Sequence, residues 1–206
     1  VLAQPYQCDG KITLIADTGF SAYTWSNGQT SPTISVNTAG DYTVTVTDAF
    51  GCTGTDVVAV TIPAPPVVAV LGTLVFCENA TSTLTATPGF VNYLWNTGAA
   101  TPEIVVNATG NYDVTVTDAL GCTATALANA SAQPLPTPTI TGTAALCPGS
   151  TGALTAAGNF VTYNWSTAQN TPTITVANAG AYAVTVTDLL GCTGTAITTV
   201  TAATAD

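Results

Sequence analysis

Six cysteines are the residues of this chain whose type and spacing most clearly carry chemistry: Cys8, Cys52, Cys77, Cys122, Cys147 and Cys192. Taken two at a time along the chain they are 44, 45 and 45 residues apart, and 25 residues separate each pair from the next. An even number of cysteines at regular spacing is typical of disulfide frameworks in oxidising surroundings. The cysteines therefore predict disulfides and an extracellular or cell-surface protein.

The side chains of ordinary enzyme mechanisms are scarce. The 206-residue chain contains no His and a single basic residue, Lys11, so the usual general base and metal ligand are missing. Carboxylate pairs for glycoside hydrolysis would have to converge, yet residues 133–206 contain only Asp188 and Asp206. We therefore expect no enzymatic activity, no cofactor and no metal site.

The charge of the chain excludes two classes of partner. Eleven acidic residues against one basic residue give a net charge of −10, and such a surface cannot neutralise nucleic-acid phosphates. Anionic membranes also require clustered Lys or Arg. The longest apolar stretches, such as residues 67–71, are far too short to cross a bilayer. We expect no nucleic acid and no membrane insertion.

Three aspartates recur before a glycine: Asp48, Asp118 and Asp188. Each could be a Ca²⁺ ligand, but Ca²⁺ takes six to eight oxygen ligands and no second carboxylate recurs beside these. Asp before Gly is also the usual composition of a tight turn, where the carboxylate accepts backbone N–H groups. The pattern favours a turn between two strands.

The chain is built from three copies of one unit. The spacing of 70 residues is kept by Trp25, Trp95 and Trp165 and by Tyr42, Tyr112 and Tyr182. Proline-rich segments at 63–66 and 134–138 favour extended linkers and cannot donate regular ladder bonds. The predicted domains are residues 1–62, with a truncated first strand, residues 63–132 and residues 133–206.

Within each copy the apolar residues recur every second position. In the first copy Tyr42, Val44 and Val46 alternate with threonines, which is the pattern of a strand with one buried face. Short strands of this kind with turn residues between them are typical of a β-sandwich. The fold class is therefore predicted as all-β, with three tandem β-sandwich domains in an end-to-end rod.

These residues resemble the immunoglobulin-type sandwich, which has a buried Trp on strand C and a Tyr two residues before the strand F cysteine. Trp25 and Tyr42 match those positions, and the resemblance places both, with their repeats, in the core. Ala16 and Val44 stand where the family has its inter-sheet disulfide. Ala168 replaces Gly28 in the third copy, so a different turn is expected there.

The whole chain is similar to the Ig-like and PKD-like tandem repeats of large secreted bacterial surface proteins. The shared motifs are Trp-Ser-Asn-Gly at 25–28 and the segment from Gly40 to Cys52. The family implies adhesin stalks, surface filaments or spacer arrays, and so a structural protein of cell adhesion.

The same topology bears on cysteine pairing. An intradomain pair would lie roughly 25–30 Å apart across the length of a sandwich, whereas a disulfide needs Cα atoms within about 7 Å. In domains stacked end to end, Cys8 approaches Cys122 and Cys77 approaches Cys192. Cys147 is then left to pair with Cys52 of the next chain. Intradomain pairing in a distorted fold and free thiols remain the alternatives.

Two functions follow from these features. In the first, copies of the chain assemble head to tail, the tail of one completing the short first domain of the next, or the chain is a window of a longer array. In the second, the chain is an array of modules that bind carbohydrate or another surface ligand. The exposed aromatic residues that such binding needs would be Phe20, Phe90 and Phe160.

Overall fold

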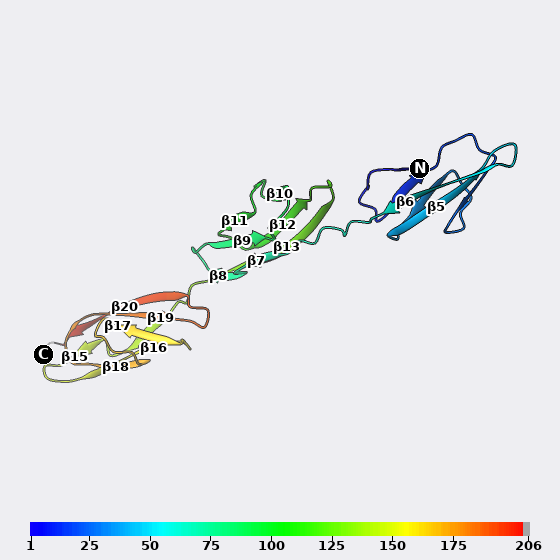
Figure 1. Cartoon of the computed structure of the whole chain (residues 1–206). Coiled ribbons are helices and arrows are strands. Elements are labelled where there is room, and N and C mark those ends of the chain that lie inside the picture. Colours follow the sequence, from blue (N-terminus) through cyan, green and yellow to red (C-terminus); the bar gives the residue numbers. More distant parts are fainter. Residues whose placement is uncertain (204–206) are drawn as a thin grey trace. The chain divides into compact units, whose positions relative to one another are not determined.

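The computed structural model describes residues 1–203, and Thr204, Ala205 and Asp206 lie outside the described residues. Over the described part the regular structure is entirely β-strand (Figure 1). It accordingly includes no helix able to span a membrane. The first predicted repeat contains β1 (Leu2–Ala3), β2 (Ile12–Ile15), β3 (Ala22–Trp25), β4 (Thr33–Val36), β5 (Gly40–Thr47) and β6 (Thr53–Val60).

The later repeats contain the same series with additional strands. The second contains β7 (Val70–Gly72), β8 (Val75–Cys77), β9 (Ser82–Ala86), β10 (Asn92–Trp95), β11 (Glu103–Val106), β12 (Gly110–Thr117) and β13 (Thr123–Gln133). The third contains β14 (Thr139–Gly142), β15 (Ala145–Leu146), β16 (Gly152–Ala157), β17 (Thr162–Trp165), β18 (Thr173–Val176), β19 (Gly180–Thr187) and β20 (Thr193–Ala202).

Each repeat forms two sheets. One sheet has the order β1-β2-β4, β11-β9-β7 or β14-β16-β18, and the other has β3-β5-β6, β10-β12-β13-β8 or β15-β20-β19-β17. In strand letters these are A-B-E and C-F-G, the two layers of an immunoglobulin-type sandwich. The predicted fold class, all-β with tandem β-sandwich domains, is confirmed.

Alternating burial along the strands builds the core between the layers. Ile12, Leu14 and Ala16 are buried from the A-B-E side, and Tyr23, Trp25 and Val44 from the C-F-G side. Ala16 and Val44 are both almost fully covered, as are their counterparts in the later repeats: Ala86, Val114, Ala156 and Val184. Small apolar pairs thus fill the place of the inter-sheet disulfide.

The three core tryptophans lie where the resemblance put them. Trp25, Trp95 and Trp165 are buried, and each indole N–H donates to a carbonyl six residues later, at 2.9 Å: Ser31, Thr101 and Thr171. A buried indole N–H requires such a partner. Each tryptophan therefore fills the core and also fixes the loop that follows its strand.

The predicted core tyrosines sit nearer the edge of the sandwich. Tyr182 is buried, whereas Tyr42 and Tyr112 are half-buried. The hydroxyl of Tyr42 donates to the carbonyl of Thr38 at 3.0 Å, and that of Tyr182 donates to Asn178 at 2.8 Å. This bond to the backbone four residues upstream is the tyrosine corner of such sandwiches.

The turn after strand C is the same in the first and third repeats. Gly28 and Ala168 both have positive φ, at 85° and 62°. Each donates its N–H to the carbonyl of the preceding tryptophan, Trp25 or Trp165, at 2.9 Å. The expectation that Ala168 gives a different turn is wrong, because the alanine accepts the left-handed conformation at some cost in strain.

Two short strands were not anticipated. β8 and β15 run parallel to β13 and β20 and extend the C-F-G sheets of the second and third repeats. The described first repeat, residues 1–62, has no counterpart to them. In the third repeat Ala203 donates its N–H to Leu146, at 2.8 Å. Pro63 holds the corresponding position after β6 and has no N–H to donate.

Backbone contacts gather the described residues into two compact units. The first comprises Val1–Leu71, Ala86–Pro102 and Tyr112–Leu127, and the second comprises Gly72–Thr85, Glu103–Asn111 and the chain from Ala128 on. The second repeat contributes to both. Each unit therefore contains one of the places where successive repeats meet. The domain boundaries at 62/63 and 132/133 stay predictions.

Candidate functional site

The turn between strands F and G carries the second cysteine of each repeat. In the first repeat the Asp48 carboxylate accepts the backbone N–H groups of Phe50 at 2.8 Å and of Cys52 at 2.9 Å. Asp118 and Asp188 hold Cys122 and Cys192 in the same way, at 2.9 Å. The aspartates thus serve as turn residues, as the sequence favoured, and they present the three cysteines in one conformation.

The turn between strands A and B carries the first cysteine. The carbonyl of Cys77 accepts the N–H of Ala80 at 3.0 Å, and that of Cys147 accepts the N–H of Ser150 at 3.0 Å. The third residue of each turn, Asn79 or Gly149, has positive φ. Cys147 is therefore presented in a turn built like that of Cys77.

Two disulfides join these two kinds of turn. Cys8 is bonded to Cys122 with Cα atoms 5.4 Å apart, and Cys77 is bonded to Cys192 with Cα atoms 5.5 Å apart. Each bond links the first cysteine of one repeat to the second cysteine of the next and lies within one compact unit. These are the two pairs that the Ig topology favoured over intradomain pairing.

Cys52 and Cys147 are free thiols, and both are exposed. The counterparts of Cys52 in the later repeats, Cys122 and Cys192, are buried in their disulfides, whereas Cys8, a counterpart of Cys147, is bonded and still exposed. The structure thus brings four of the predicted disulfide residues together in two pairs. It leaves an unbonded second cysteine in the first repeat and an unbonded first cysteine in the third.

The aromatic residues proposed for ligand binding are partly used by the fold. Phe20, Phe90 and Phe160 lie edge-on against Tyr23, Tyr93 and Tyr163, with ring centroids 6.2, 6.1 and 5.8 Å apart. Phe20 is exposed, whereas the other two are half-buried. These contacts brace the loop before strand C, so each ring has a structural role beside any role in binding.

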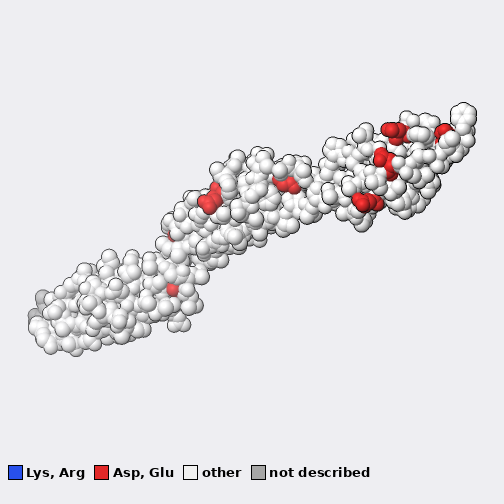
Figure 2. All heavy atoms as spheres, in the orientation of Figure 1, with Lys and Arg blue, Asp and Glu red and all other residues white. Residues whose placement is uncertain are grey.

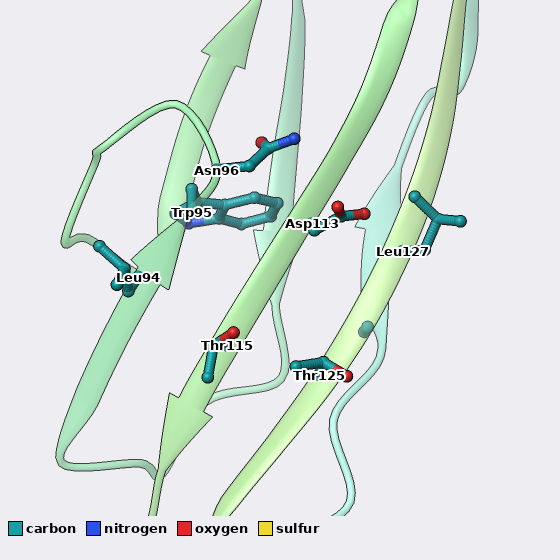
Figure 3. A pocket seen from close by; sticks show the side chains of 8 residues that line it. Leu94, Trp95, Asn96, Asp113, Thr115, Thr125 and Leu127 are labelled. Atoms are coloured by element: carbon teal, nitrogen blue, oxygen red, sulfur yellow. The ribbon is translucent and has the colours of Figure 1, made fainter.

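An open groove lies on the outer face of the C-F-G sheet of the second repeat (Figure 3). It has a volume of about 510 Å³ and runs between the exposed side chains of Leu94 and Leu127. Figure 3 shows Asn96, which follows β10, and Asp113 on β12 between these walls. The sequence did not single out these residues, since Leu94, Asp113 and Leu127 occupy outward strand positions and Asn96 lies in a turn.

The other repeats lack the polar pair of this groove. Ser26 and Thr43 replace Asn96 and Asp113 in the first repeat. There the Ser26 hydroxyl accepts the Thr43 backbone N–H at 3.2 Å. The third repeat has Ser166 and Ala183 with the same bond, also at 3.2 Å. The Asn96 and Asp113 pair that lines this groove is therefore specific to the second repeat.

Charge is unevenly distributed over the chain. Figure 2 shows acidic side chains on the first and second repeats and a nearly uncharged surface on the third. Within the described part of the third repeat, residues 133–203, Asp188 is the single acidic residue and it holds a turn. The turn of Cys147 continues with Pro148, Gly149 and Ser150, so it carries no charge.

No known protein family and no curated protein matches this sequence. Among solved structures, a 1.5-MDa bacterial ice-binding adhesin is 16% identical, with 93% of this chain and 90% of that chain covered and a TM-score of 0.38. Murine CEACAM1b is 12% identical, with 66% and 100% covered and a TM-score of 0.33.

A third similar structure is the protein SGBP-B of the Bacteroides ovatus mixed-linkage glucan utilization locus, in complex with a heptasaccharide. It is 15% identical, with 95% of this chain and 64% of that chain covered and a TM-score of 0.24. All three likenesses are remote. The fold assignment rests on the strand order of the chain itself, and function has to be inferred from its own residues.

Proposed function

We propose that the chain is a structural, non-enzymatic extracellular protein, the repeat subunit of a bacterial surface filament or adhesin stalk that assembles head to tail. The observation that carries the proposal is the disulfide pattern. Both bonds obey one rule, the first cysteine of a repeat with the second cysteine of the following repeat. Applied to the two remaining thiols, the rule pairs Cys147 with Cys52 of another copy.

The local geometry supports that pair. Cys52 sits in the same Asp-held turn as Cys122 and Cys192. Cys147 sits in a turn of the same kind as that of Cys77. Both thiols are exposed, so neither turn has to rearrange before the bond forms. A junction between chains would then repeat the junction already present within each chain.

A contact of this kind uses two different surfaces, so it does not close into a dimer and continues into a fibre. The scarcity of charge also fits an assembled protein, since only 6% of the residues are charged. Monomeric β-proteins normally keep their edge strands apart with charged side chains. Disulfides persist in oxidising surroundings, which fits a location outside the cell.

Peptide mapping without reduction tests the proposal. A mixture of ¹⁴N- and ¹⁵N-labelled chains is oxidised, digested and examined by mass spectrometry. We expect a peptide that joins Cys52 to Cys147 and carries mixed labels, together with filaments in electron micrographs. Cys147→Ser should stay monomeric. A peptide that joins Cys8 to Cys52, or Cys52–Cys147 pairs without mixed labels, would contradict head-to-tail assembly.

The groove of the second repeat supports a second candidate, an array of modules that binds a neutral glycan or a similar surface ligand. Asp113 and Asn96 offer hydrogen-bonding groups between the apolar walls Leu94 and Leu127. Polar groups framed by apolar contact are the usual composition of a ligand site.

Titration of neutral oligosaccharides against the whole chain tests this candidate. Asp113→Ala should weaken binding about tenfold, which corresponds to the loss of one hydrogen bond to a charged group. Thr43→Ala, at the equivalent position of the first repeat, is the matched control and should leave binding unchanged. Equal effects of the two substitutions would exclude the groove as the site.

A further inference from the structure

We infer that the turn Asp48–Cys52 is a docking surface for a second copy of this chain, with Phe50 as its apolar anchor and the Cys147 turn as its seat. The inference rests on the proposed head-to-tail assembly and deepens it. The two copies then associate first through Phe50. The disulfide between Cys52 and Cys147 forms afterwards and makes that contact covalent.

The first observation is the exposure of one side chain at three equivalent turns. Phe50 is 93% exposed, whereas its counterparts Leu120 and Leu190 are 55% and 57% exposed. The three turns share their hydrogen bonds to the aspartate, so the backbone presents the side chain in the same kind of turn in each repeat. Leu120 and Leu190 lie in turns that are disulfide-bonded to the preceding repeat, whereas Phe50 lies in a turn whose cysteine has no bond within the chain.

The second observation is the chemistry of the three seats. Cys8 is followed by Asp9 and Cys77 by Glu78, which are charged, whereas Cys147 is followed by the exposed Pro148. Within the chain the disulfides join these two charged turns to the turns that carry Leu120 and Leu190. The turn of Cys147, which has no partner within the chain, is uncharged. Phe50, whose turn also has no partner within the chain, is larger than Leu120 and Leu190.

This match indicates the occupant of the Phe50 surface. Aromatic side chains bury the largest apolar areas at interfaces, and an exposed Phe gains most where the opposite surface has no charge to desolvate. The Cys147 turn, with Pro148 and Gly149, is such a surface. A turn that carries Asp9 or Glu78 would bind Phe50 less favourably than the Cys147 turn. This preference directs the Phe50 turn of one copy to the Cys147 turn of the next.

The rate of cross-linking tests the inference on the full chain. Reduced thiols of Cys52 and Cys147 are allowed to oxidise in a glutathione buffer, and dimers containing the Cys52–Cys147 bond are counted over time. We expect Phe50→Ser to slow dimer formation about tenfold or more, as the loss of one buried aromatic contact implies. Pro148→Asp should slow it to a similar extent, because it places a charge where Phe50 would have to desolvate it. Both positions are exposed, so the fold, checked by circular dichroism, should not change.

Leu189→Ser is the matched control, because Leu189 is also 93% exposed in an equivalent turn but lies where the junction is already filled. Its dimers should form at the rate of the parent. Equal slowing by Leu189→Ser, or normal rates with Phe50→Ser, would overturn the inference and leave the proposed function standing. A parent chain that forms no Cys52–Cys147 bond would overturn both.

Discussion

Trp95→Ala is expected to lower the free energy of unfolding of the second repeat by about 3–5 kcal/mol. The indole is among the largest fully buried side chains of the protein. It faces Val114 across the strand pair β10 and β12, and its N–H donates to Thr101. Truncation therefore leaves a cavity in a small core and also removes a buried hydrogen bond.

Chemical denaturation followed by tryptophan fluorescence and circular dichroism measures this effect. Leu94→Ala is the matched control, since Leu94 precedes Trp95 on β10 and points outward into solvent. It should change stability by less than about 1 kcal/mol. A Trp95→Ala chain that unfolds at the denaturant concentration of the parent would show that the strand register described here is wrong.

Removal of the Cys77–Cys192 disulfide by Cys77→Ser with Cys192→Ser should cost about 4–5 kcal/mol in the unfolding of the third repeat. The bond closes a loop with a sequence separation of 115 residues. In the chain-entropy account, a cross-link over so long a loop removes much freedom from the unfolded state. The buried Cys192 also loses its apolar contacts.

Denaturant midpoints of the double variant and the parent measure the effect under non-reducing conditions. The matched control is Cys52→Ser with Cys147→Ser, which replaces two cysteines that form no bond within the chain. That control should unfold like the parent monomer. Equal stability of the two double variants would mean that the third repeat gains nothing from the cross-link.

Much of the fold could be predicted because its signals are local. Alternation along residues 42–47 marks β5 and its repeats, and Trp25 and Tyr42 at their fixed places indicate the two layers. The aspartate turns follow from Asp48 and Gly51 alone. Such features need only the chain within a few residues of each position.

Features that depend on distant segments could not be predicted. β8 and β15 have three and two residues, too short to show a period, and they form only because the strand beside them continues. Val46, expected to face inward, is half-buried in the first repeat, whereas Val116 and Val186 are buried. The groove of the second repeat joins outward residues of three strands, so no single segment indicates it.

The candidate site could be predicted from the sequence only in part. The spacing of the cysteines, combined with an assumed topology, was enough to favour Cys8 with Cys122 and Cys77 with Cys192. The exposure of Phe50 relative to Leu120 and Leu190 required coordinates, because the three positions look alike in sequence. The role proposed for Pro148 could not be predicted either. It depends on the observation that the Cys147 turn is built like the Cys77 turn but has no disulfide.

The two disulfides overlap along the sequence, and this limits how far the protein can be stretched. Cys8 and Cys192 are 184 residues apart, but the shortest covalent path between them crosses both bonds and follows only the 45 residues from Cys122 back to Cys77. At roughly 3.4 Å per residue, full unfolding under tension would extend that span to about 150 Å rather than about 630 Å. Residues 9–76 and 123–191 then lie outside the path that carries the force. Between Cys8 and Cys192 the protein can therefore extend by much less than its sequence length would allow.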